Sequence, residues 1–155
     1  MNNKNVFWFE IVDHLSLQEP VIVNEDTTIV DAVKQMQQHE IGCLLITSKK
    51  NELTGIVTTR DIMHEYVDTS LPGETEVSLI MTKNPITIPP DMKITEAAEH
   101  LYKNNIRHFP VLKGNKIKGL LSVRVLMDFI AEHLPSEVLN LPPDRSIIPK
   151  EPDGG

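Results

Sequence analysis

The fold of this 155-residue chain is decided by the stretch Gly55-Ile56-Val57-Thr58-Thr59-Arg60-Asp61, which returns in altered form as Gly119-Leu120-Leu121-Ser122-Val123-Arg124-Val125. In both stretches a glycine and two apolar residues end a β-strand pattern. A hydroxyl residue follows, of the kind that caps the first turn of a helix. A strand that leads directly into a helix therefore occurs twice, and the chain contains two copies of one unit.

The repetition extends outward from these two stretches with a single one-residue gap. Pro20 aligns with Pro85 at an offset of 65 residues, and Gly55 aligns with Gly119 at an offset of 64. Two copies are too few for a solenoid, which needs at least about three repeats. The sequence therefore predicts a pseudo-symmetric pair. We divide it into a first copy (12–67), a linker (68–76), a second copy (77–133) and a Pro-rich tail (134–155).

Each copy has the same internal order: a short strand, an amphipathic helix, a strand, a polar turn, a second hairpin strand and a last helix. This β-α-β-β-α order, repeated, predicts an α+β protein in which each copy buries one sheet face under two helices. Neither copy is large enough to be comfortable alone, so we expect the two to pack sheet to sheet as one module. The predicted strands are 21–23, 43–47, 53–57, 86–88, 109–112 and 117–121.

Composition restricts the classes of function. Apolar residues make up 40% of the chain and charged residues 24%, which is typical of globular proteins. The formal net charge of −7 disfavours a nucleic-acid partner, because such proteins need a basic face. No apolar stretch is long enough to span a bilayer, so we expect no membrane partner. Residues 1–10 lack the apolar region of a signal peptide, and we expect a cytoplasmic protein.

Thr58 and Asp61 stand three residues apart where a helix should begin, and two interpretations are open. In the first, they form a capping box, with Thr58 as N-cap and Asp61 as the third helical residue. In the second, the carboxylate accepts the hydroxyls of a ribose, and the hydroxyl beside free backbone N–H groups holds a phosphate. Both interpretations can hold together.

The stretch from Gly55 to Asp61 resembles the ribose-phosphate motif of CBS (cystathionine-beta-synthase) domains, and the resemblance covers about residues 12–133. It implies a tandem pair, called a Bateman module, with segment 77–85 as the strand that leads into the second copy. It also implies two clefts between the copies, each with a ribose-binding aspartate from one copy and an adenine pocket from the other. The implied function is regulatory and non-catalytic: the module binds AMP, ADP, ATP or another adenosyl compound, needs no cofactor, and passes its state to an effector protein.

Carried over to this sequence, the resemblance assigns eight residues to the first cleft. Arg107 suits a phosphate because its planar guanidinium pairs with two phosphate oxygens at once. Alternatively, Arg107 and His108 are solvent-facing residues that lead into a strand. The assigned residues are Thr58, Asp61, Ile86, Thr87, Ile106, Arg107, His108 and Pro110.

The second cleft departs from the family pattern. Ser122 stands in place of the threonine, but Val125 stands in place of the aspartate, and valine cannot bind a ribose diol. No cation matches Arg107 on the opposite wall, so we expect this cleft to be empty of nucleotide or filled by side chains. The residues implied for that wall are Val21, Ile22, Ile41, Gly42, Cys43 and Leu45.

A second hypothesis is a ligand-free dimerisation or interaction module, in which Thr58 and Asp61 serve only as a cap. The presence of both Asp61 and Arg107 favours the ligand. An enzyme is disfavoured because the chain has no nucleophile elbow, Walker loop or dinucleotide fingerprint, and its six histidines show no metal-ligand spacing. The family and the apolar helix faces also lead us to expect a homodimer. Those faces carry Ile62, Tyr66, Leu126 and Phe129.

Overall fold

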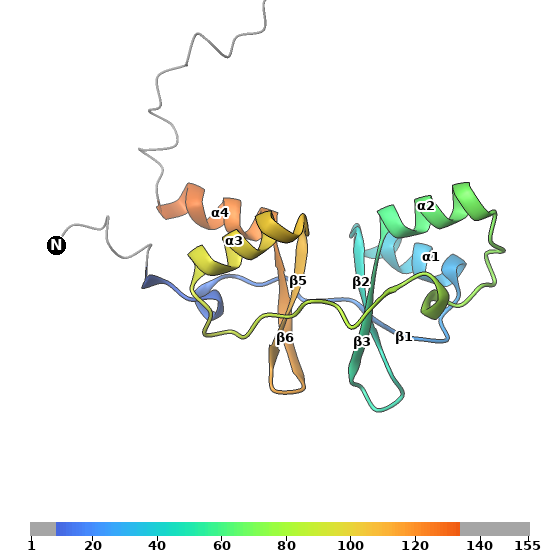
Figure 1. The fold of residues 1–155 in the computed structure, drawn as a ribbon, viewed down its shortest axis with the longest axis horizontal. Coiled ribbons are helices and arrows are strands. Elements are labelled where there is room, and N and C mark those ends of the chain that lie inside the picture. Colours follow the sequence, from blue (N-terminus) through green and yellow to red (C-terminus); the bar gives the residue numbers. More distant parts are fainter. Residues whose placement is uncertain (1–8, 134–155) are drawn as a thin grey trace, which may run out of the picture.

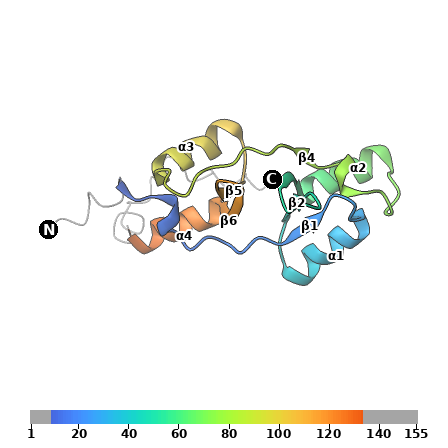
Figure 2. The same ribbon diagram turned by 90° about the horizontal axis from the view of Figure 1, so that it is seen from below.

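A computed structural model describes residues 9–133, apart from the side chains of residues 66–69. The tail predicted over 134–155, and the Tyr66 side chain expected on a helix face, lie outside the described part. Figure 1 shows two similar halves side by side, with a sheet of each half at the centre and two helices of each half on the same side of the molecule. The second view, in Figure 2, shows the same separation into halves.

The predicted order of elements is confirmed in the first half and corrected in the second. The strand predicted over 86–88 is reduced to a single parallel bridge between Ile88 and Val111. Segment 77–85 is not one strand, because it begins with a short 3-10 helix, Val77–Leu79, before a two-residue strand. The elements are β1 (Ile22–Asn24), α1 (Ile29–His39), β2 (Cys43–Thr47), β3 (Leu53–Thr58), α2 (Thr59–Thr69), β4 (Thr82–Lys83), α3 (Ile94–Asn104), β5 (His108–Lys113), β6 (Lys116–Ser122) and α4 (Val123–His133).

The two sheets are built on the same hairpin. In the first half, β2 and β3 pair antiparallel, β1 joins β2 in parallel, and β4 joins β3, which gives the order β1-β2-β3-β4. In the second half, β5 pairs antiparallel with β6. Gln18 forms an antiparallel bridge to Leu120 of β6. This bridge is the counterpart of the pairing between Thr82 of β4 and Ile56 of β3 in the first half. The segments that lead into each copy thus lie along the sheet of the other copy.

This exchange of lead-in segments extends into the cores. Val12 is fully buried in the second half, where its N–H donates to the Met92 carbonyl at 2.9 Å. Val77 is fully buried in the first half, where its N–H donates to the Thr27 carbonyl at 2.8 Å. Each half therefore needs a segment from the other repeat to complete its core, which joins the two copies into one folded unit.

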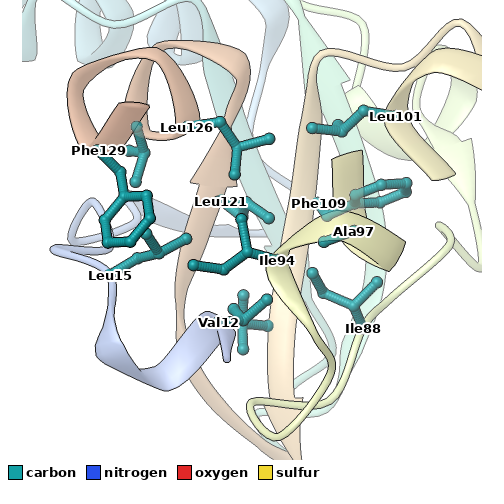
Figure 3. Close-up of a cluster of buried hydrophobic side chains, with 12 residues drawn as sticks. Val12, Leu15, Ile88, Ile94, Ala97, Leu101, Phe109, Leu121, Leu126 and Phe129 are labelled. Atoms are coloured by element: carbon teal, nitrogen blue, oxygen red, sulfur yellow. The ribbon is translucent and has the colours of Figure 1, made fainter. Parts of the chain in front are cut away.

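Three apolar clusters hold the molecule together. The cluster of the second half lies between its helices and its sheet, with Phe109, Leu121 and Ile94 among its members (Figure 3). An equivalent cluster fills the first half. The third lies between the two sheets, which confirms the predicted sheet-to-sheet packing. Its buried members are Cys43, Leu45, Ile56 and Leu120.

Alanine substitutions at Gly55 and Gly119, the pseudo-equivalent glycines of the two hairpins, should affect stability unequally. A Cβ on Gly119 would lie 2.8 Å from the Cβ of Leu17, which is fixed to the backbone. A Cβ on Gly55 would instead meet Sδ and Cγ of Met81, a long unbranched side chain that can change rotamer. Crowding a packed site costs about 1–3 kcal/mol when neighbours cannot move away. We expect Gly119→Ala to lower the free energy of unfolding by this amount, and Gly55→Ala to lower it less, in urea titrations. Equal losses would contradict the packing described for Leu17.

Candidate functional site

The start of α2 is fixed by a reciprocal capping box, as the first interpretation of Thr58 and Asp61 predicts. The Thr58 side chain accepts a hydrogen bond from the Asp61 N–H at 3.3 Å. Asp61 Oδ2 accepts from the Thr58 N–H at 2.8 Å and from the Thr58 hydroxyl at 2.7 Å. The carboxylate is thus held in one orientation, and among the described residues no hydrogen bond engages its second oxygen, Oδ1.

A cavity of about 530 Å³ opens in front of this helix start. One side is formed by the end of β3 and the first turn of α2, with Thr58, Arg60 and Asp61. The other side comes from the second repeat: the turn after α3, which contains Arg107, and the segment after β4, which contains Ile86. The cavity therefore combines a carboxylate and a guanidinium from one repeat with a guanidinium from the other.

Six of the eight residues assigned from the sequence line this cavity, namely Thr58, Asp61, Ile86, Ile106, Arg107 and His108. The cavity wall does not include the other two. Thr87 is exposed between Ile86, which faces the cavity, and the buried Ile88. Pro110 is fully buried, because it pairs with Leu120 where the two sheets pack together.

Of the two alternatives expected for the second cleft, the structure contradicts one, namely that side chains fill it. A cavity of about 460 Å³ lies there, next to the start of α4. As expected, the first-repeat residues that line this cavity include no cation matching Arg107. The two arginines that do line it, Arg107 and Arg124, come from the second repeat, and Arg107 lines the first cavity as well. Of the six wall residues implied, Ile22 and Leu45 do not line it; Val21, Ile41, Gly42 and Cys43 do.

Comparison with known proteins identifies the family of the chain. The model of the CBS domain family matches the chain twice, over residues 12–68 and 76–132. The chain belongs to the CBS-domain family. As a tandem CBS pair it is 34% identical, over 122 residues, to the CBS domain-containing protein CBSCBSPB2 of Arabidopsis thaliana. That match takes in 77% of this chain but only 23% of the relative's length.

Two solved structures share the fold of this CBS pair. The CBS domain pair of protein MJ0100, in complex with 5′-methylthioadenosine and S-adenosyl-L-methionine, is 23% identical with a TM-score of 0.72, and the match covers 80% of this chain and 98% of that one. CBSX2, in complex with AMP, is 18% identical with a TM-score of 0.69, and the match covers 79% of this chain and 96% of that one. At these identities the likeness establishes the fold.

Sequence reasoning missed several residues of the first cavity in this CBS pair. Asn84 and Asn105 both line it with left-handed backbones, at φ 48° and φ 51°. Asparagine tolerates this conformation better than other non-glycine residues. The available indication was that Asn84 stands two residues before the assigned Ile86, and Asn105 one residue before the assigned Ile106. Arg60 was missed because its place in the family motif is variable.

Other chemistry is limited in the described part of the chain. No group of three His, Cys, Asp or Glu residues is placed to hold a metal ion there, and no helix among those residues is long and apolar enough to cross a membrane. Burial, with a smaller contribution from the Asp61 charge, raises the pKa of the Cys43 thiol to about 12. Cys43 is therefore a protonated wall residue at neutral pH and a poor nucleophile.

The environment of His108 leads to a prediction of how the free energy of unfolding depends on pH. Burial, and then the charge of Arg107, lowers the pKa of His108 from its ordinary value of 6.5. The folded state thus holds this proton less tightly than the unfolded state, so the contribution is complete above pH 6.5 and is lost as the pH falls toward the folded pKa. The free energy of unfolding is measured by urea titration from pH 8 to pH 5, which is ~1.5 units either side of the ordinary pKa. We expect it to fall less steeply with decreasing pH in His108→Gln than in the wild type. His39→Gln, at an exposed position, is the control, and parallel profiles for wild type and His108→Gln would contradict the assignment.

Proposed function

We propose that this CBS pair is a regulatory module without catalytic activity, and that it binds an adenine nucleotide in the first cavity. One observation carries the proposal: Asp61 of the first repeat and Arg107 of the second, far apart in the sequence, line the same cavity. A cap needs only Thr58 and Asp61. It gives no reason for a guanidinium from the other repeat to face the same space.

The proposed contacts follow from the chemistry of each wall. Asp61 Oδ1 accepts hydrogen bonds from the ribose hydroxyls, while Oδ2 stays with Thr58. Arg60 and Arg107 offer two cations to the phosphates. Ile86 and Ile106 offer apolar surface to the base.

The neighbouring structures support an adenosyl ligand in general. The MJ0100 pair is described with 5′-methylthioadenosine and S-adenosyl-L-methionine, and CBSX2 with AMP. Among such compounds we propose AMP, ADP or ATP, because two arginines face one carboxylate in the first cavity. A ligand held between two repeats can bias their relative position, and an effector protein can respond to that change.

A homodimer is part of the proposal, but not for the reason expected from the sequence, because Ile62, Leu126 and Phe129 are buried in the cores of this chain. Met63 on α2 and Met127 on α4 occupy equivalent positions in the two repeats and are 66% and 54% exposed. Apolar residues repeated on the helical side of both halves are suited to contact a second copy. Light scattering should give twice the mass of the 17.5 kDa chain, and a monomer at micromolar concentration would refute the dimer while leaving the ligand proposal intact.

A binding panel tests the proposed ligand class. AMP, ADP, ATP, S-adenosylmethionine and 5′-methylthioadenosine should be compared with GMP by thermal shift, since a ligand that binds only the folded state raises its melting temperature. We expect the adenine nucleotides to raise it and GMP to leave it unchanged. If no adenosyl compound binds, the ligand-free interaction module becomes the better description.

A further inference from the structure

The two cavities differ in the charges that line them. The first carries two arginines, Arg60 and Arg107, and one carboxylate, Asp61. The second carries two arginines, Arg107 and Arg124, and two carboxylates, Glu19 and Glu40. Its charged lining is therefore balanced, which suits a ligand with one acidic and one basic group better than a nucleotide with several negative charges.

Glu40 is placed in this cavity by an unfavourable backbone conformation. It ends α1 with φ 52° and ψ 42°, in the left-handed region. At the equivalent position of the second repeat, Asn105 lines the first cavity with nearly the same dihedrals. A glutamate has none of the local advantage of asparagine in this region, so its backbone conformation is unfavourable.

Besides the charged groups, the second cavity has the polar residues Gln18, His108 and Ser122 and an apolar part of its wall. The apolar part is formed by Pro20, Val21, Ile41 and Leu120. Val125 stands where α2 has Asp61, and the first turn of α4 contains no acidic residue. The apolar part accepts an alkyl or aryl side chain, and the start of α4 offers no carboxylate equivalent to the one that Asp61 offers at the start of α2.

We propose that the second cavity binds a free α-amino acid with an apolar side chain. Its carboxylate pairs with Arg107 and Arg124, its ammonium group pairs with Glu19 and Glu40, and its side chain lies on the apolar wall. No covalent step is involved.

Arg107 couples this site to the first cavity, a consequence that rests on the proposed nucleotide function. Arg107 lines both cavities, and its guanidinium cannot pair fully with a nucleotide phosphate and an amino-acid carboxylate at once. Each ligand should therefore weaken the other, and linkage requires the two factors to be equal. The CBS pair would then respond to the ratio of amino acid to nucleotide.

The first experiment needs no nucleotide. Leucine, methionine and phenylalanine are titrated into the full chain by calorimetry, together with 3-methylbutylamine and 4-methylpentanoate, which are leucine without its carboxylate and without its ammonium group. We expect at least one amino acid to bind, and each truncated analogue of leucine to bind roughly tenfold or more weakly than leucine. If none of the three amino acids binds at millimolar concentration, or if an analogue binds as well as leucine, the proposal is overturned.

Two matched arginine variants locate the site. Arg60 and Arg124 are the second residues of α2 and α4, and each lines one cavity only. Arg124→Gln should weaken the amino acid roughly tenfold and leave AMP unaffected, and Arg60→Gln should do the reverse. The opposite pattern would place the amino acid in the first cavity and overturn the proposal. Glu40→Gln keeps the length and backbone of Glu40 and should also weaken the amino acid.

A competition titration then tests the coupling. Saturating leucine should raise the apparent Kd of AMP, and saturating AMP should raise that of leucine by the same factor. Independent binding of the two ligands would refute the shared role of Arg107. If AMP does not bind at all, the nucleotide function fails, while the titrations of leucine and its analogues still decide the second site.

Discussion

Replacing Phe109 by alanine is expected to lower the free energy of unfolding by about 3–5 kcal/mol. Phe109 is fully buried at the second position of β5, and it packs among Ala97 and Leu101 of α3 (Figure 3). The loss combines the transfer of a large aromatic side chain to water with the cavity that it leaves. Since total stability of a domain is about 5–15 kcal/mol, the effect should be large in a urea titration.

The control for this prediction is Tyr102→Ala. Tyr102 lies on α3 and is 88% exposed, so its removal should change the free energy of unfolding by no more than about 0.5 kcal/mol. A loss below about 1 kcal/mol for Phe109→Ala would contradict the packing of the second half. His108, a residue of the first cavity, directly precedes Phe109. Unfolding of Phe109→Ala would therefore also lower the apparent nucleotide binding, so binding should be measured on the folded fraction of this variant.

Replacing Asp61 by asparagine is expected to weaken AMP binding roughly ten- to a hundredfold. Hydrogen bonds to a charged group contribute about 1.5–3 kcal/mol each, and every 1.4 kcal/mol is about a tenfold change in affinity. The asparagine oxygen can replace Oδ2 and keep both hydrogen bonds from Thr58. The amide NH₂ then faces the cavity in place of Oδ1, and it cannot accept a ribose hydroxyl.

The melting temperature of the ligand-free protein should hardly change in Asp61→Asn, because asparagine is also a good capping acceptor. The control ligand is 2′-deoxy-AMP, which should bind the wild type more weakly than AMP does, with a smaller difference in Asp61→Asn. A lower melting temperature with unchanged AMP affinity would show that Asp61 is a cap alone, and its ribose role would have to be abandoned.

Much of the fold could be predicted from the sequence, because local patterns set it. The apolar spacing of Ile29 and Met36 predicted α1, and Ile94 and Leu101 predicted α3 in the same way. The Thr58 capping box marked the start of α2 to the residue. These features depend on residues a few positions apart, which a sequence displays directly.

The lead-in segments could not be predicted in the same way. Segment 77–85 was expected to be a strand, but its backbone is bonded to distant residues, as in the bond from the Val77 N–H to the Thr27 carbonyl. Such a segment has neither a helical nor a strand period. The burial of Val12 in the second half has the same origin, since only the tertiary fold brings it to Met92.

The wall shared by the two cavities was missed for a geometric reason. The family pattern gives each residue to one cleft, and it gave Arg107 to the first. In the structure Arg107, His108 and Gly42 line both cavities, so the two clefts are neighbours with a common wall. A sequence shows which residues are equivalent between repeats, but it does not show how close two pseudo-symmetric sites lie.

The central claim, one nucleotide per chain held by Asp61 and Arg107, is tested most directly by a calorimetric titration of the full chain with AMP. The account predicts one site per chain, much weaker in both Asp61→Asn and Arg107→Gln, and unchanged in Arg124→Gln. Two equivalent sites per chain, or a single site indifferent to Asp61→Asn and Arg107→Gln, would contradict it.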